Sequence, residues 1–247
     1  MPEIPVRFIS RSEKMTEIPK LTPRLRAAAE LVESGSFVAD VGTDHAYLPI
    51  ALCLEGRIRG GVASDINQGP IDRARENIKK YGLEDRLYAV RTDGLDGIGS
   101  YEPDCVMILG MGGELIARIL SDAPWTRKRG LRLCLQPMTH PEKLREFLAS
   151  AGYSVTDEKI VIEENRIYQI ILSEFTDTPQ EYSEEQLLLG KINIERHTAE
   201  LVRLAEHYVS VLEKRADGKR CAGADVAEEE ALIRKIKEAA YDGKAAL

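Results

Sequence analysis

The alternation of short apolar runs with helix-like segments between residues 37 and 152 is the feature that most limits how this chain can fold. The strand-like runs are Phe37–Val41, Gly61–Ser64, Arg86–Arg91, Asp104–Leu109 and Leu131–Leu135. Most are apolar throughout, as in the strands of a parallel sheet buried on both faces. A helical pattern separates most successive runs. This order predicts an α/β fold with right-handed crossovers and a ligand crevice at the carboxyl ends of the strands.

The alternation ends in two long strand-like runs, Tyr153–Glu163 and Arg166–Glu174, which are separated only by Glu164-Asn165. Two such runs joined by two turn-forming residues predict a hairpin, so the mostly parallel sheet closes with an antiparallel strand. Dinucleotide-binding folds ordinarily lack this ending. Rossmann-like methyltransferases that use S-adenosylmethionine (SAM) are known for it, which makes the hairpin the best topological discriminator in the chain.

The N-terminal segment lacks the strand–helix alternation. Residues 1–20 are polar, contain prolines and show no periodicity, so we expect a flexible N-terminal arm, and Met15 is a possible native start. Thr22-Pro23 is a typical helix start, because threonine caps backbone amides and proline fits the first turn. It predicts a helix over Thr22–Ser34, and we expect the main α/β domain to span residues 21–178.

A charged, helix-like region follows Pro179. Apolar residues recur there every seven positions, with Leu204 and Val211 completing the stripe of Leu187, Ile194, Leu201 and Tyr208. This spacing predicts one long helix from Ser183 to about Lys214, and a second helix after a break at residues 216–224. We expect an antiparallel, coiled-coil-like helical hairpin over residues 179–247, a second domain that cannot bury its apolar stripe alone.

Composition restricts location and oligomeric state. The hydrophobic fraction of 43% and charged fraction of 30% are those of an ordinary globular protein, and no apolar run reaches bilayer length. The four cysteines form no CxxC pair, so we expect buried thiols and no metal site. We therefore expect a cytoplasmic protein without membrane contact, and favour a monomer.

The net charge of −7 gives no overall reason to expect a nucleic-acid partner. Basic residues nevertheless gather in three groups: Arg7, Arg11, Lys14, Lys20, Arg24 and Arg26; Arg127, Lys128, Arg129 and Arg132; and Lys214, Arg215, Lys219 and Arg220. Each group alone is most simply a solvated face. Convergence of two groups on one face would indicate a phosphate-binding track.

Candidate cofactor residues follow the first three strands. Gly42 begins a turn after the first strand, but a dinucleotide fingerprint would require three glycines there. Asp65 ends the second strand, where a carboxylate can accept both ribose hydroxyl hydrogens of an adenosine, and Asp93 follows the third, where it could accept the adenine amino hydrogens. Either aspartate alone could equally cap a helix or a turn. Their joint position at one sheet edge favours cofactor binding.

Two further turns carry open alternatives. Gly110-Met111-Gly112-Gly113 follows the fourth strand, where the glycines allow either close approach of a ligand or a purely structural entry into a helix. Asp44 either faces the reacting atoms or caps the helix that starts near Ala46. For His45 next to it, a structural hydrogen-bonding role is favoured over a functional one.

With these residues placed, the chain resembles the bacterial tRNA adenine-22 N1-methyltransferase family. The matching segments are Leu21–Leu25, Ala39–Pro49, Asp65–Pro70, Asp93–Leu95, Gly110–Gly113 and Leu135–Pro137. The helical hairpin is similar to the family's C-terminal coiled-coil domain. The resemblance implies a SAM-dependent enzyme with a Rossmann-like class I methyltransferase fold that methylates N1 of an adenine in the D-loop region of tRNA. Where some relatives carry Asn after Gln-Pro, this chain has Met138.

The residues and the resemblance together give a set of assignments. Asp44 is the candidate catalytic residue. Cofactor binding is assigned to Asp40, Gly42, Thr43, His45, Asp65, Ile66, Asp93, Gly94, Gly110, Met111 and Gly112, and substrate binding to Arg24, Arg26, Tyr47 and Gly113. The expected cofactor is SAM, the expected partner is tRNA, and no metal is expected.

Three other functions stay open from the sequence alone. A SAM-dependent methyltransferase of a small molecule or a protein would suit the net negative charge. An NAD-dependent oxidoreductase would suit the nucleotide-type turn after the first strand, although the missing glycines and the closing hairpin count against it. A non-catalytic RNA-binding or scaffold protein could use the helical hairpin to dock its partner.

Overall fold

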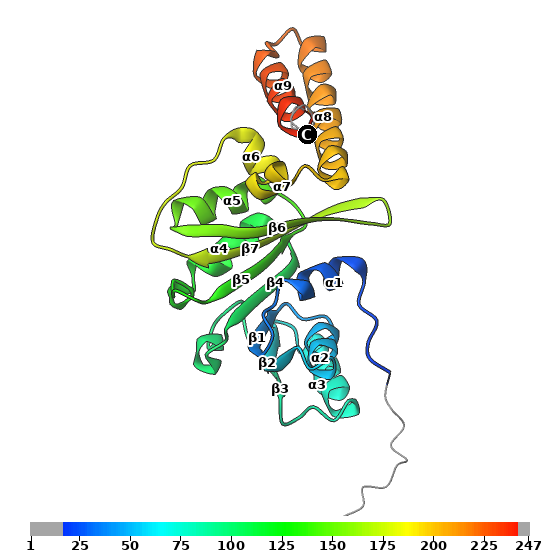
Figure 1. Cartoon of the computed structure of the whole chain (residues 1–247), viewed down its shortest axis with the longest axis vertical. Helices are drawn as coiled ribbons and strands as arrows, with labels where there is room; N and C mark the ends of the chain where they lie inside the picture. Colours follow the sequence, from blue (N-terminus) through cyan, green and yellow to red (C-terminus); the bar gives the residue numbers. More distant parts are fainter. Residues whose placement is uncertain (1–16, 242–247) are drawn as a thin grey trace, which may run out of the picture.

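A seven-stranded sheet in the order β3-β2-β1-β4-β5-β7-β6 forms the centre of the computed structural model, which describes residues 17–241 (Figure 1). The strands are β1 (Ser36–Val41), β2 (Ile58–Asp65), β3 (Leu87–Arg91), β4 (Cys105–Met111), β5 (Arg132–Pro137), β6 (Tyr153–Glu163) and β7 (Arg166–Phe175). Strands β1 to β5 pair in parallel, whereas β7 is antiparallel to both β5 and β6. The predicted α/β sheet with a closing antiparallel hairpin is therefore confirmed.

The hairpin turn forms as the sequence predicts. Glu164 and Asn165 have φ angles of 49° and 64°, and Glu163 pairs with Arg166 across the turn. Two successive positive φ angles match the right-handed twist of the flanking strands, which is why such two-residue turns are favoured.

The structure describes only part of the predicted N-terminal arm. Residues 1–16, with Arg7, Arg11, Lys14 and Met15, lie outside the described residues.

Helices cover both faces of the sheet. One layer consists of α1 (Pro23–Glu30), α2 (Tyr47–Leu54) and α3 (Gln68–Lys80), and the other of α4 (Gly113–Ser121) and α5 (Pro141–Ser150). Short 3-10 helices cover Ile98–Tyr101 and Pro124–Thr126. Along β4, Cys105 and Met107 face the first layer while Val106 and Ile108 face the second, so this central strand is buried on both sides.

The first helix begins where Thr22-Pro23 predicts. The Thr22 hydroxyl oxygen accepts a hydrogen bond of 3.4 Å from the Leu25 amide, and Pro23 occupies the first turn. The helix ends at Glu30 rather than Ser34, and β1 starts at Ser36. Cys53, Cys105 and Cys134 are buried as expected, whereas Cys221 is exposed.

In the C-terminal region, the prediction of one long helix over Ser183–Lys214 is wrong. Three helices take its place, α6 (Glu184–Leu189), α7 (Lys191–Arg196) and α8 (Ala199–Cys221), and α9 (Ala227–Tyr241) follows. The breaks fall at Gly190 and His197, whose φ angles are 88° and 46° and thus incompatible with a continuous right-handed helix. Thr198 then starts α8 anew, because its hydroxyl accepts the Leu201 amide at 3.3 Å.

The apolar stripe of α8 also differs from the predicted one. Val211 is 49% exposed, and the buried residues are Leu201, Leu204, Ala205, Val209, Leu212 and Ala216. Leu187 and Ile194 lie in α6 and α7, so the seven-residue repeat that starts from them does not predict which face of α8 is buried. The stripe packs on α9 and on Ile160 and Ile167 of the β6–β7 hairpin, so the helical pair at the β6 side of the molecule shares its core with the sheet (Figure 1).

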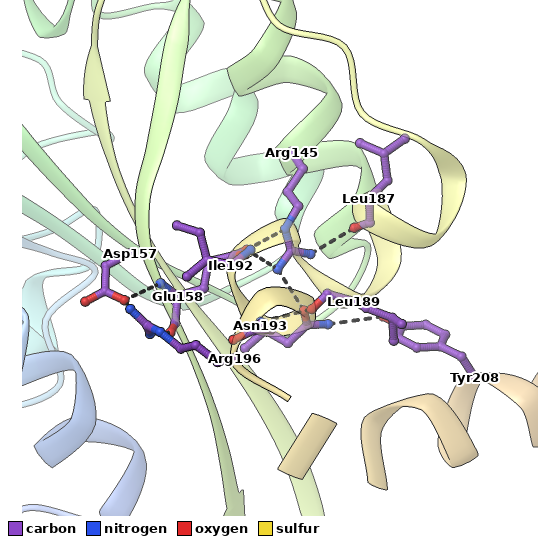
Figure 2. Close-up of polar contacts among 10 residues, drawn as sticks. Arg145, Asp157, Glu158, Leu187, Leu189, Ile192, Asn193, Arg196 and Tyr208 are labelled. Atoms are coloured by element: carbon purple, nitrogen blue, oxygen red, sulfur yellow. Dashed lines mark hydrogen bonds and ion pairs between the residues drawn. The ribbon is translucent and has the colours of Figure 1, made fainter. Parts of the chain in front are cut away.

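A buried ion pair joins this region to the sheet (Figure 2). Arg145 on α5 and Glu158 on β6 are each 1% exposed, and their side chains meet at 2.6 Å. Arg145 Nη1 also donates to the Leu187 carbonyl oxygen at 2.8 Å, and Glu158 Oε2 accepts the Ile192 amide at 3.0 Å. The pair thereby bonds α6 and α7 to the sheet. Because α6 also contacts α8 and α9, the division at residue 178 stays a prediction.

Gly190 lies directly against this ion pair. A Cβ atom at Gly190 would lie 2.5 Å from both carboxylate oxygens of Glu158, and the φ of 88° independently favours glycine. Gln169 extends the network, because its Oε1 accepts from Arg145 at 2.8 Å and its Nε2 donates to the Tyr208 hydroxyl at 3.3 Å. The network therefore runs from α5 through β6 and β7 to α8.

The Arg145→Met variant tests how much this network contributes to the stability of the folded protein. Removing the cation leaves the Glu158 carboxylate buried without its partner, so we expect the free energy of unfolding to fall by about 3 to 5 kcal/mol. Urea unfolding followed by circular dichroism measures the change. Lys143→Met is the matched control, since Lys143 forms an exposed pair with Glu146 on the same helix and its loss should change little. Equal effects of the two variants would contradict this assignment.

Candidate functional site

The carboxyl ends of the parallel strands meet at one edge of the sheet. Val41 of β1 pairs with both Ser64 of β2 and Ile108 of β4, and Asp65 pairs with Arg91 of β3. The strand order reverses direction between β1 and β4, which is the switch point where open α/β sheets bind ligands. The turns after these strands therefore surround one crevice, as the sequence predicts.

The turn after β1 is held by a dense set of hydrogen bonds. Gly42, with a φ of 73°, and Thr43 both donate their amides to the Ser64 carbonyl oxygen at 2.8 Å. The Thr43 hydroxyl donates to Asp40 Oδ2 at 2.6 Å and accepts the Ala46 amide at 3.2 Å. Thr43, rather than Asp44, therefore supports the start of α2, and the alternative that Asp44 caps this helix is wrong. Asp40 and Thr43 act beneath the crevice.

Asp40 is a buried carboxyl with an unusual protonation equilibrium. Burial raises the pKa of Asp40 to about 6, although the hydrogen bond from Thr43 opposes the shift, and the nearby charge of Asp44 adds to it. A carboxyl that titrates near neutral pH at the base of a crevice is characteristic of a functional site, although buried structural groups also shift in this way.

A cavity of about 220 Å³ opens above this turn. It brings together six of the predicted cofactor residues: Gly42, Asp65, Ile66, Asp93, Gly94 and Met111. Gly42 and Gly94 have positive φ, and a Cβ atom on Gly42 would overlap the Met111 side chain. Asp65 accepts the Asn67 amide at 2.7 Å through one carboxylate oxygen, which leaves the other available to a ligand. A neighbouring cavity of about 690 Å³ shares Asp93 and Gly94.

The residues of this cavity fit the adenosine part of a nucleotide-like cofactor. The buried hydroxyl of Ser64 has no hydrogen-bond partner among the described residues. Two carboxylates at successive strand ends can accept ribose and amino hydrogens, and Ile66, which is 54% exposed, offers an apolar surface for a base. The described residues contain no cluster of side chains suited to a metal ion.

Other predicted residues lie around the cavity rather than on its wall. The Asp44 side chain is 91% exposed, and its Oδ1 lies 3.0 Å from His45 Nε2. The His45 ring stacks on Tyr47, with centroids 5.5 Å apart, and the His45 carbonyl oxygen accepts from Asn77 at 2.9 Å. Asp44 and Tyr47 are thus exposed beside the turn after β1, with the half-buried His45 between them.

The two arginines assigned to the substrate have protein partners. Arg24 Nη1 donates to Gln136 Oε1 at 2.6 Å, and its guanidinium lies 5.3 Å from the centre of the Tyr168 ring. Gly110 is next to it, since a Cβ there would lie 3.6 Å from Arg24 Nη1. Arg26 pairs with Glu55 at 2.7 Å. Arg24 thus lies beside the carboxyl ends of β4 and β5, whereas Arg26 contacts the end of α2.

Gly112 and Gly113 connect the turns after β4 and β5. Gly112 precedes α4, and the Gly113 amide donates to the Thr139 carbonyl oxygen at 2.8 Å. A Cβ on Gly113 would overlap the His140 carbonyl oxygen. Gly113 thus serves close backbone packing here, and its role toward a substrate stays a prediction.

Sequence reasoning missed three residues of α4 on the cavity wall. Leu115, Arg118 and Ile119 all line it. Their spacing of three and four residues puts them on one face of the helix that follows the glycine turn. That spacing, read with the glycine turn as the helix start, is the signal that would have found them.

Among residues 17–241, no helix is both long and apolar enough to cross a membrane.

Comparisons with known proteins agree with this geometry. Residues 21–171 match a family model described as a methyltransferase domain. The tRNA (adenine(22)-N(1))-methyltransferase of Bacillus subtilis is 36% identical over 173 residues, which cover 70% of this chain and 73% of that protein.

Two solved structures are also similar. Streptococcus pneumoniae Sp1610 in complex with S-adenosyl-L-methionine has a TM-score of 0.78 and 28% identity, over 90% of this chain and 100% of that one. M. capricolum TrmK in complex with S-adenosyl-homocysteine has a TM-score of 0.75 and 26% identity, over 88% of this chain and 96% of that one.

The Asp40→Asn variant tests the cost of burying this carboxylate while keeping an acceptor for Thr43. Because the folded pKa is raised, the folded protein binds more protons than the unfolded chain between about pH 4 and 6, and stability falls as the pH rises through that window. At about pH 7.5 we expect the free energy of unfolding of the variant to exceed that of the wild type by up to about 3 kcal/mol. This difference should become smaller as the pH is lowered. Urea unfolding across this pH range measures the difference, and a pH-independent difference would contradict the raised pKa.

Proposed function

Since this chain belongs to the bacterial tRNA (adenine(22)-N1)-methyltransferase family, we propose that it transfers a methyl group from SAM to N1 of adenine 22 in tRNA. The observation that carries the proposal is the cavity at the switch point, where Asp65, Asp93 and two glycines with positive φ meet. This arrangement suits an adenosine-containing cofactor. The assignment of tRNA as the substrate rests on membership of the family.

The cofactor would be held by groups from four turns. Asp65 would accept the ribose hydroxyl hydrogens, Asp93 the adenine amino hydrogens, and Ile66 would contact the base. Gly42 and Met111 would border the part of the crevice between β1 and β4. SAM supplies an activated methyl group on a positively charged sulfur, and the buried carboxylate of Asp40 lies beneath the same turn.

The chemistry asks for alignment more than for a strong base. Adenine N1 carries an in-plane lone pair at neutral pH, so the N–C bond can form as the S–C bond breaks, without prior removal of a proton. The protein must orient that lone pair and stabilise the positive charge that develops on the ring. Asp44 is suited to this, because its exposed carboxylate can leave His45 and accept a hydrogen from the adenine amino group.

The target base must leave the stacked core of tRNA to reach the crevice. Tyr47 is 41% exposed beside Asp44 and offers an aromatic surface for stacking, with Met111 as a second candidate contact. Arg24 stands at the same edge, although its bond to Gln136 would need to be shared with the RNA. We propose a monomer that acts in the cytoplasm.

The reaction product is the direct test of the proposed function. Bulk tRNA is incubated with the protein and methyl-labelled SAM, digested to nucleosides and separated by chromatography. We expect label in 1-methyladenosine, and no label when adenine 22 of a transcribed tRNA is replaced by guanine. Label in any other nucleoside, or in a protein or small-molecule fraction, would overturn the proposed substrate.

The Asp44→Ala variant tests the catalytic assignment. Loss of the carboxylate should lower turnover by at least about 100-fold while SAM affinity, measured by calorimetry, changes less than about threefold. Asp85→Ala is the matched control, since Asp85 is exposed in the loop before β3, at the opposite edge of the sheet. If turnover and SAM affinity fall together, Asp44 is a cofactor-binding or structural residue instead.

A further inference from the structure

A groove of about 590 Å³ lies between the helical pair and the sheet. One wall is the segment after β5, residues 137–142, and the opposite wall is α8. Ile167 and Gln169 of β7 contribute to it between these walls. The proposed chemistry at the cofactor cavity uses none of these residues.

The α8 wall presents one continuous helix face to the groove. It contains Leu204, His207, Tyr208, Val211 and Arg215, whose spacing of three and four residues follows the helical repeat. Val211 is 49% exposed there, and Met138 on the other wall is 45% exposed. Two large apolar side chains thus stay open to solvent on the two walls of one groove, which marks a binding surface.

The groove is directly connected to the candidate active site. The Met138 amide donates to the Met111 carbonyl oxygen at 2.7 Å, and the Thr139 carbonyl oxygen accepts the Gly113 amide at 2.8 Å. Met111 lines the cofactor cavity. The same short segment therefore borders the groove on one side and is bonded to the crevice on the other.

The charges around the groove are cationic on the α8 side. Arg203 and Lys214 are next in sequence to the lining residues Leu204 and Arg215, and both are exposed with no ion pair to a carboxylate among the described residues. Glu142 lines the groove from the other side and lies 3.0 Å from His140. Arg215 has a partner, since its Nε lies 3.1 Å from Glu229. Free cations beside an apolar slot are complementary to a nucleotide, whose phosphate is anionic and whose base is flat and apolar on its faces.

We propose that this groove binds an unstacked nucleotide of the tRNA substrate, next to the target adenine, with its base between Met138 and Val211 and its phosphates near Arg203 and Lys214. The inference rests on the proposed function. Drawing the target out of the tRNA core unstacks its neighbours, which then need a surface of their own. Burial raises the pKa of Tyr208 to about 12, so its hydroxyl stays protonated and can donate to a base edge.

The Val211→Glu variant places a charge inside the groove at an exposed position that the fold tolerates. We expect the KM for tRNA to rise at least about tenfold while SAM affinity stays at the wild-type value. Ala224→Glu is the matched control, because it adds the same charge at an exposed residue of the loop between α8 and α9, outside the groove, and we expect its KM within about threefold of wild type. Melting temperatures of both variants confirm that they fold.

A second measurement concerns the phosphates. Lys214→Ala should weaken tRNA binding and reduce the slope of log Kd against log salt concentration by about 1, whereas Arg234→Ala, an exposed arginine on α9, should leave the slope unchanged.

Three outcomes would overturn the inference. They are equal KM values for Val211→Glu and wild type, equal effects of Val211→Glu and Ala224→Glu, or a wild-type dimer that Val211→Glu converts to a monomer in light scattering, which would make the groove an interface between copies of the chain. Failure of the proposed function is distinguishable, because the wild-type protein would then form no 1-methyladenosine in tRNA.

Discussion

The buried ion pair between Arg145 and Glu158 is the constraint on which the placement of the C-terminal helices depends. Two charges at 1% exposure are costly unless their hydrogen-bonding capacity is used, and here the partners come from α6, α7 and β7. Gly190 is required beside Glu158 because a side chain would displace the carboxylate. The helical pair is therefore seated in one orientation, and the groove facing α8 has a defined shape.

A second constraint is the close approach of neighbouring turns at the carboxyl edge of the sheet. Gly42 lies under the Met111 side chain, and Gly113 lies against the backbone of the segment after β5. The glycines allow these turns to touch, and the hydrogen bonds between them make the cofactor cavity and the groove parts of one connected surface.

Much of the α/β region could be predicted because its determinants are local. A continuous apolar run buried on two faces, a threonine-proline helix start and a two-residue turn each act within a few residues, so strands, α1 and the β6–β7 hairpin follow from pattern alone. The C-terminal region could not be predicted in this way. Its helix breaks at Gly190, where the Glu158 carboxylate from a distant strand occupies the space of a side chain.

For the site, the sequence by itself determined which chemical groups are present: the glycine turns, and carboxylates such as Asp65 and Asp93 at successive strand ends, which parallel pairing brings to one edge. Only the tertiary structure decided what each group is free to do. In the folded protein, Arg26 forms an ion pair with Glu55, and burial raises the pKa of Asp40 to about 6. Val211 is exposed on a groove instead of packed in an apolar stripe between helices. The physical reason is that partners, burial and free surface depend on residues that are far apart in the chain.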